Sequence, residues 1–128
     1  MVAVDTDIVV RLLTADDPRQ TDRARRLFES ETIFLAKTVL LETEWVLRRL
    51  YRLEREPVNR ALEGLLSLAN VRCEDEPGLR QALAWNREGL DFADALHLAS
   101  SRTAERFVTF DRAMINTATT TGRPVSEP

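Results

Sequence analysis

The chain alternates short apolar runs with longer segments in which apolar residues recur every three or four positions. Short apolar runs of this kind predict β-strands, and a spacing of three or four predicts amphipathic helices. We expect strands at 2–4, 32–35, 71–73, 107–110 and 124–126. We expect helices at 7–13, 19–30, 39–53, 57–68, 78–87, 92–103 and 112–118. Strands that alternate with helices predict an α/β fold with a mainly parallel sheet.

Length and composition indicate one globular domain that spans residues 1–128. A chain of 128 residues with 44% hydrophobic and 30% charged residues can bury one core. It has no secretory leader and no apolar run near the ~20 residues that span a bilayer, so we expect a cytoplasmic protein without membrane contact. Cys73 is the only cysteine, which excludes an internal disulfide, and we expect it to be buried in a strand. His97 is the only histidine, which excludes a two-histidine metal site.

Four carboxylates occupy positions where a metal ion would explain them. Asp5 and Asp111 come directly after or close to the ends of predicted strands, and ligands gather at the carboxyl ends of parallel strands. Glu42 and Asp94 fall inside predicted helices. The three aspartates Asp5, Asp91 and Asp111 also have a purely structural explanation, because each can cap the helix that follows it.

Glu42 is expected to be buried. At about 100° per residue it falls on the same helix face as Val39 and Val46, whereas Glu44 faces away and has Arg48 four residues on as a partner. A buried carboxylate is unfavourable without compensation. Either a metal ion or an arginine from another helix would supply it.

Asp91 and Asp94 are three residues apart and share a helix face. Two carboxylates about 5 Å apart repel by roughly 3 kcal/mol at an effective dielectric constant of 20, which a nearby cation would offset. Oxygen ligands alone favour Mg²⁺ or Mn²⁺ over zinc. An ion of this kind activates water and neutralises charge in phosphoryl chemistry.

Charge gives two different indications about nucleic acid. The net charge of −3 argues against a protein that coats nucleic acid through its overall field. All basic residues except Lys37 are arginine, however, and Arg48, Arg49, Arg52 and Arg55 cluster in one stretch. Arginine binds phosphates and stacks on bases, so the cluster permits a nucleic-acid surface. Solvated helix faces would explain it equally well.

Four segments resemble the motifs of PIN-domain nucleases. They are Val4-Asp5-Thr6-Asp7-Ile8-Val9-Val10-Arg11-Leu12-Leu13, Val39-Leu40-Leu41-Glu42-Thr43-Glu44-Trp45-Val46-Leu47, Asp91-Phe92-Ala93-Asp94-Ala95-Leu96 and Val108-Thr109-Phe110-Asp111. Their order and spacing cover nearly the whole chain. The length and the third motif are most similar to the VapC-type toxins of bacterial and archaeal toxin–antitoxin pairs.

The resemblance implies a three-layer α/β/α sandwich with a central, mainly parallel sheet of four to five strands. It implies Mg²⁺- or Mn²⁺-dependent RNA cleavage, homodimerisation and inhibition by a VapB-type antitoxin. An exposed loop of a structured RNA, such as a tRNA or ribosomal hairpin, is the expected substrate, since unpaired bases are the readable ones. Arg48, Arg49 and Arg52 are candidates for RNA contact.

The motif match also assigns residues. Asp5 and Asp94 are the leading metal ligands, and Glu42 and Asp111 complete the acidic set. Supporting roles fall to Thr6 and Thr109 as hydrogen-bond partners of carboxylates, to Asp7, which stands where the family commonly has Asn, and to Asp91, as a helix cap or a ligand of a second metal ion.

Two other functions are considered. Asp5-Thr6-Asp7 also resembles phosphatases of the haloacid dehalogenase type, but that reaction requires a later lysine and Lys37 comes too early. The second is a catalytically weak PIN-fold binding module that acts through its antitoxin partner. The presence of all four acids argues against a decayed site.

Overall fold

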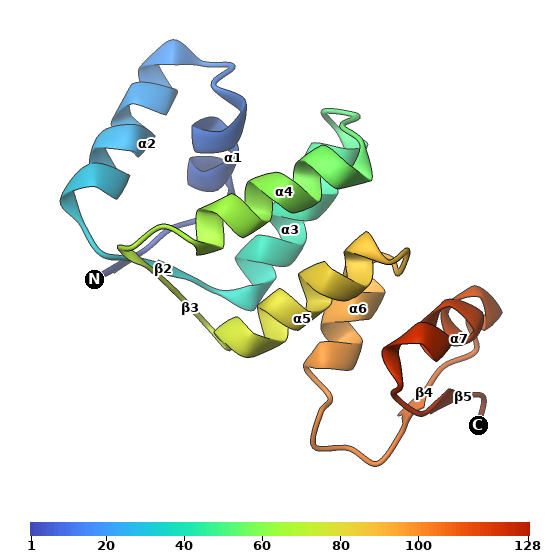
Figure 1. Cartoon of the computed structure of the whole chain (residues 1–128). Coiled ribbons are helices and arrows are strands. Elements are labelled where there is room, and N and C mark those ends of the chain that lie inside the picture. Colours follow the sequence, from blue (N-terminus) through green and yellow to red (C-terminus); the bar gives the residue numbers. More distant parts are fainter. The chain divides into compact units, whose positions relative to one another are not determined.

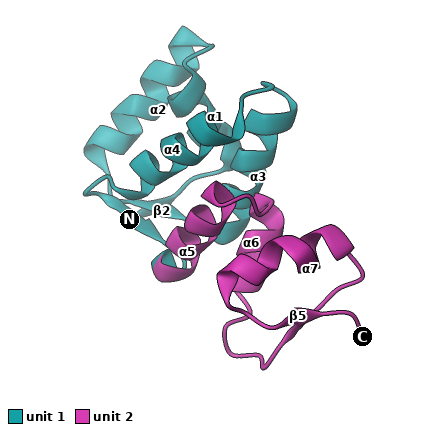
Figure 2. Ribbon diagram, turned by 45° about the vertical axis from the view of Figure 1, so that its right-hand side comes forward, with its two compact units in different colours: residues 1–76 teal, residues 77–128 magenta.

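The computed structural model describes all 128 residues, which fall into two compact units, residues 1–76 and 77–128 (Figures 1 and 2). Every strand pairing is parallel, and helices connect the paired strands. The predicted α/β class is therefore confirmed. A single domain stays a prediction. No helix combines the length and the apolar character that crossing a bilayer requires.

The first unit is built around a three-stranded parallel sheet. Its elements are β1 (Val2–Ala3), α1 (Thr6–Thr14), α2 (Pro18–Ser30), β2 (Ile33–Leu35), α3 (Lys37–Arg49), α4 (Arg55–Leu66) and β3 (Val71–Cys73). The strand order is β1-β2-β3, with Ile33 paired to Val2 on one side and Val71 on the other. Parallel neighbours need crossover connections, which here are the helix pairs α1–α2 and α3–α4. The N-terminus of α1 therefore begins at the carboxyl end of β1.

The core of the first unit lies between this sheet and its helices. Ile33 and Leu35 of β2 are fully buried, as are Leu40 of α3 and Leu62 of α4. The alternation of buried and half-buried positions along β2 is that of a strand with one fully covered face. Cys73, which we expected to be buried, is only half-buried at the end of β3.

The second unit contains α5 (Glu76–Arg87), α6 (Phe92–Ala99), β4 (Phe107–Val108), α7 (Arg112–Ala118), a 3₁₀ turn (Thr119–Thr121) and β5 (Val125–Ser126). Helix α5 begins at the boundary between the units. Strands β4 and β5 pair in parallel, with Phe107 opposite Val125, and α7 lies between them in the chain. Leu79, Leu83 and Phe92 are among its fully buried side chains.

The predicted elements are all present, with differences at their ends. The five strands divide into a three-stranded and a two-stranded sheet, and β1, β4 and β5 are only two residues long. The helix predicted at 39–53 ends at Arg49, because Arg52 adopts a left-handed backbone conformation with φ 55°. The helix predicted at 92–103 ends at Ala99, where Ser100 caps it.

Candidate active site

Asp5 joins β1 to α1. It is the N-cap of α1, and its Oδ1 accepts a hydrogen bond of 2.7 Å from the Thr6 backbone N–H. The side chain is exposed. The capping contact and the position at a strand end are thus both present, and the cap engages only one carboxylate oxygen.

Glu42 is exposed on α3, so its predicted burial is wrong. The buried face of α3 consists of Leu40, Thr43, Glu44 and Leu47. Glu44 is 9% exposed and forms an ion pair with its predicted partner Arg48. The distance from Nη1 of Arg48 to Oε2 of Glu44 is 3.8 Å. Glu44 is therefore the carboxylate that the fold buries on this helix, and Glu42 is available to solvent and ligands.

Thr6 links Asp5 to Glu42. Its backbone N–H donates to Asp5, and its hydroxyl donates a short hydrogen bond to Oε1 of Glu42. Thr6 is itself buried, with 6% of its surface exposed, so its position is fixed by packing. The predicted hydrogen bond from Thr6 to a carboxylate is present and orients two acids from segments far apart in the chain.

The three acids Asp5, Asp7 and Glu42 line one groove of about 360 Å³ in the first unit. We call it the acidic groove, and it is lined by Asp5, Thr6, Asp7, Val10, Arg11, Glu42, Val46, Leu50 and Tyr51. Asp7 lies in the first turn of α1, where a negative charge interacts favourably with the helix dipole. The groove gives the acids of this unit a common opening to solvent.

In the second unit, Asp91 and Asp111 are helix N-caps. Asp91 accepts a hydrogen bond of 3.3 Å from the Asp94 backbone N–H, and Asp111 accepts one of 3.1 Å from the Met114 backbone N–H. Thr109 accepts a hydrogen bond of 3.0 Å from the Asp111 backbone N–H. Thr109 therefore contacts the backbone of Asp111 and not its carboxylate, which differs from the expected contact.

Asp94 lies half-buried in the first turn of α6. Burial raises the pKa of its carboxyl, and the charges of Asp91 and Asp111 raise this pKa further, while His97 acts in the opposite direction. The raised pKa shows that negative charge at Asp94 is unfavourable in the metal-free protein. A bound cation would reverse this effect.

Because its pKa is raised in the folded state, ionised Asp94 destabilises the metal-free fold. The protonated Asp94 carboxyl contributes to stability at pH below the ordinary aspartate pKa of 3.8, and this contribution is lost as pH rises through the raised pKa. Asp94→Asn should therefore raise Tm in EDTA at pH 7 by about 1–3 °C, because it removes a half-buried negative charge that lies near Asp91 and Asp111. Calorimetry from pH 3 to 8 tests this. The advantage of the variant should disappear at the acid end, and an unchanged advantage there would contradict the prediction.

The donors fit a hard divalent cation by their chemistry. All of the candidate ligands are carboxylates, which is the set that Mg²⁺ and Mn²⁺ prefer. No group of three or more His, Cys, Asp or Glu side chains is arranged to hold a metal ion. The nearest approach to a site is the Asp5 and Glu42 pair that Thr6 bridges.

The arginine cluster serves more than one purpose. Arg48 pairs with Glu44 and donates a hydrogen bond of 3.1 Å to the carbonyl oxygen of Leu53, so it stabilises the end of α3. Arg49 and Arg52 are exposed. These two remain candidates for RNA contact, and Arg48 has a structural role.

Sequence reasoning missed the interaction of Arg11, Asp16 and Tyr51. The Tyr51 hydroxyl donates a hydrogen bond of 2.6 Å to Oδ2 of Asp16 and accepts one of 3.1 Å from Nη1 of Arg11. Arg11 and Asp16 also form an ion pair of 3.3 Å. The hydrogen bond from Tyr51 lowers the pKa of Asp16 and the bond to Tyr51 raises that of Arg11. No local pattern signals this contact, because Tyr51 is far from both partners in the chain.

Comparison with known proteins identifies the family. The PIN-domain family profile matches residues 2–119, a range that includes most of each unit. No curated protein sequence matches the chain. One similar solved structure is that of VapC20 from Mycobacterium tuberculosis, described as a sarcin–ricin loop cleaving toxin, with 27% identity, coverage of 91% of this chain and 94% of that one, and a TM-score of 0.46. The motif resemblance is thus confirmed by the profile match, and the chain belongs to the PIN-domain family.

Proposed function

We propose that this protein is a metal-dependent endoribonuclease and the toxin of a toxin–antitoxin pair. The observation that carries the proposal is the bridge from Asp5 through Thr6 to Glu42, in a chain whose PIN-domain match extends over residues 2–119. The bridge holds the first and second acidic motifs together at the mouth of one groove. It brings two acids from segments far apart in the chain to one groove that opens to solvent.

The proposed ligands of Mg²⁺ or Mn²⁺ are Asp5, Glu42, Asp94 and Asp111. When bound, the ion supplies an activated water and neutralises charge on the phosphate. Asp7 and Asp91 add negative charge near the ligands, which raises the affinity for cations. Thr6 keeps Glu42 oriented, because its hydroxyl donates a hydrogen bond to Oε1 of the carboxylate.

The chemistry needs no covalent intermediate on the protein. His97, the only histidine, is exposed on α6, and a serine–histidine pair is not required for in-line hydrolysis by water. The residues of this chain would act by binding, orientation and charge. Cleavage should therefore depend on the number of carboxylates more than on any single proton donor.

The proposed substrate is an exposed loop of a structured RNA, in a tRNA or a ribosomal RNA, because unpaired bases can be splayed out and read. The proposed partners are a second copy of the chain and a VapB-type antitoxin. Both partners follow from the resemblance of the motifs. The proposed RNA contacts are the exposed residues Arg49 and Arg52.

The test is cleavage of total cellular RNA by the purified protein in Mg²⁺, in Mn²⁺ and in EDTA, with new 5′ ends mapped by sequencing. Discrete cuts are expected only with metal. The control variant Glu56→Gln removes an exposed acid of α4 that pairs with Arg60, and it should make the same cuts as the wild type. Absence of cuts with any metal, from protein shown to be free of antitoxin, would overturn the nuclease and favour a binding module.

A further inference from the structure

The acidic groove extends well beyond its carboxylates. Along α3 it is lined by Glu42, Val46 and then Leu50, at intervals of four residues. At a rise of 1.5 Å per residue, Glu42 and Leu50 are about 12 Å apart along the helix axis. On the facing helix α1 the lining passes from Asp7 to Val10. The groove thus has an acidic end and an end, which we call the apolar end, where Val46 and Leu50 lie near Tyr51, whose hydroxyl is bonded to Arg11.

The apolar end has one large hydrophobic side chain that the fold leaves accessible to a ligand. Leu50 is 65% exposed although it is a large hydrophobic residue at the end of α3. Val46 and Tyr51 beside it are half-buried. An exposed apolar wall inside a polar-ended groove is typical of a ligand site.

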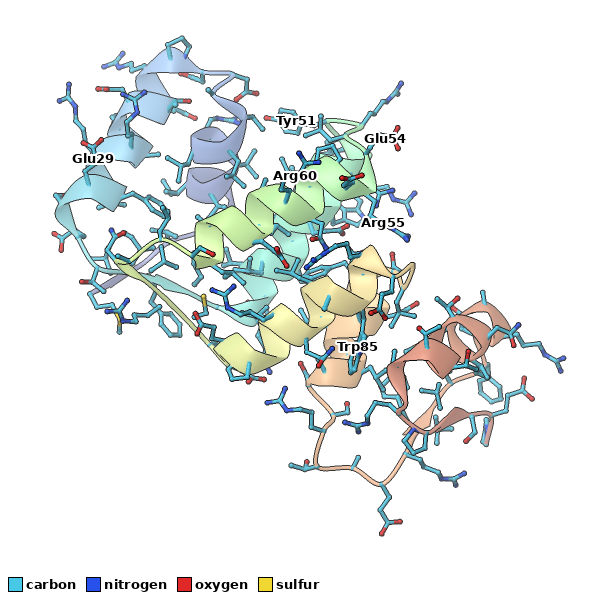
Figure 3. All side chains as sticks on the ribbon, viewed as in Figure 1. Glu29, Tyr51, Glu54, Arg55, Arg60 and Trp85 are labelled. Atoms are coloured by element: carbon cyan, nitrogen blue, oxygen red, sulfur yellow. The ribbon has the colours of Figure 1, made fainter.

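Tyr51 is held in place at this end. Figure 3 shows it on the loop between α3 and α4, and its hydroxyl is bonded to Asp16 and Arg11. Arg11 is further held by a hydrogen bond of 2.7 Å from its Nε to Oε1 of Gln20. A ring fixed by its hydroxyl loses little freedom when a ligand binds, which favours affinity.

We propose that the apolar end of the acidic groove, formed by Val46, Leu50 and Tyr51, binds one unpaired base of the RNA beside the phosphate to be cleaved. This inference rests on the proposed function. A nucleotide has the same polarity as the groove, with a phosphate for the metal-loaded acids and a flat apolar base for the wall. The volume of about 360 Å³ is in the range of small-ligand sites.

The geometry favours an unpaired base. A paired base is stacked on both faces within its helix, whereas a base in a loop can leave the stack and lie against an aromatic or aliphatic side chain. Such contacts accept any base, because every base has a flat apolar face. The subsite would therefore select single-stranded RNA without selecting its sequence.

The test measures RNA binding separately from cleavage. The full chain carrying Asp94→Asn is titrated in Mg²⁺ against a fluorescent single-stranded RNA of mixed sequence, and against an oligomer of equal length with ribose-phosphate units but no bases. Adding Tyr51→Ala should raise the Kd for the RNA roughly 5- to 100-fold, the usual effect of losing one base–aromatic contact, and adding Leu50→Ala should raise it at least about 3-fold through lost apolar contact. The Kd for the oligomer without bases should stay the same.

Leu53→Ala is the matched control. Leu53 is 42% exposed on the same loop but does not line the groove, so its truncation should leave RNA binding unchanged. Leu50→Ala is the decisive variant, because Leu50 is more exposed than Tyr51 and makes no side-chain hydrogen bond. Thermal melting of each variant shows that it is folded.

The outcomes separate this inference from the proposed function. The parent protein in this comparison is the full chain carrying Asp94→Asn alone. If adding Leu50→Ala to it leaves the Kd for RNA unchanged, or raises the Kd for RNA and for the oligomer without bases equally, the base subsite is refuted while the nuclease stands. If the parent binds no RNA and the wild type cuts none, both proposals fail. If the apolar end instead binds an apolar side chain of a protein partner, Leu50→Ala should leave RNA affinity unchanged.

Discussion

Replacing Asp5 by asparagine is expected to lower the rate of metal-dependent RNA cleavage by at least about 100-fold. Groups that merely support a metal ligand cost 10- to 100-fold when changed, so loss of a ligand charge should cost more. The fold should survive, because asparagine is as good an N-cap as aspartate and its Oδ1 can still accept the hydrogen bond from the Thr6 backbone N–H. Activity should thus be lost without a loss of structure.

Asp17→Asn provides a closely matched control. Asp17 is the N-cap of α2, accepts a hydrogen bond of 3.1 Å from the Gln20 backbone N–H, and does not line the acidic groove. Both substitutions remove one charge from a helix cap and keep the cap. Initial rates in Mg²⁺ and melting curves should show activity lost only at Asp5. Equal rates for the two variants would remove Asp5 from the metal site.

The sequence predicted well those features that depend only on residues close together in the chain. The strand at 71–73 and the helix at 112–118 have their predicted bounds. The capping alternatives for Asp5, Asp91 and Asp111 are also all present. Both kinds of feature depend on neighbouring residues alone, so a single sequence carries the necessary information.

Contacts between distant segments were out of reach. The hydrogen bond from Thr6 to Glu42 spans 36 positions, and that from Tyr51 to Asp16 spans 35. Periodicity along one helix cannot show which face another segment covers. The sequence could indicate that Thr6 was suited to support a carboxylate, but only the fold shows which carboxylate it supports.

Glu42 shows how a correct pattern led to a wrong burial. Val39, Glu42 and Val46 do share a face of α3, but the buried face is centred on Leu40 and Leu47, roughly 130° away around the axis. The face that carries Glu42 is the wall of the acidic groove, to which Val46 also contributes. Helix α3 therefore has two apolar faces, one for the core and one for the groove. Sequence alone does not tell them apart.

This arrangement predicts that neighbouring glutamates of α3 separate function from stability. Glu42→Gln should lower cleavage at least about 10-fold with little change in stability, because Glu42 is exposed and glutamine can still accept the Thr6 hydrogen bond. Glu44→Ala should lower the free energy of unfolding by about 1–3 kcal/mol, because it removes a buried carboxylate beside Arg48.

The two variants serve as controls for each other, since they stand two residues apart on one helix and each removes one negative charge. Urea unfolding should distinguish Glu44→Ala from the wild type, and cleavage rates measured well below the melting temperature should distinguish Glu42→Gln. If folded Glu44→Ala lost its cleavage activity, or if Glu42→Gln kept its activity and was only less stable, the groove face of α3 would not carry the chemistry. The separation of the two effects follows from burial, because a carboxylate that binds a ligand has to remain accessible, whereas one that stabilises the core does not.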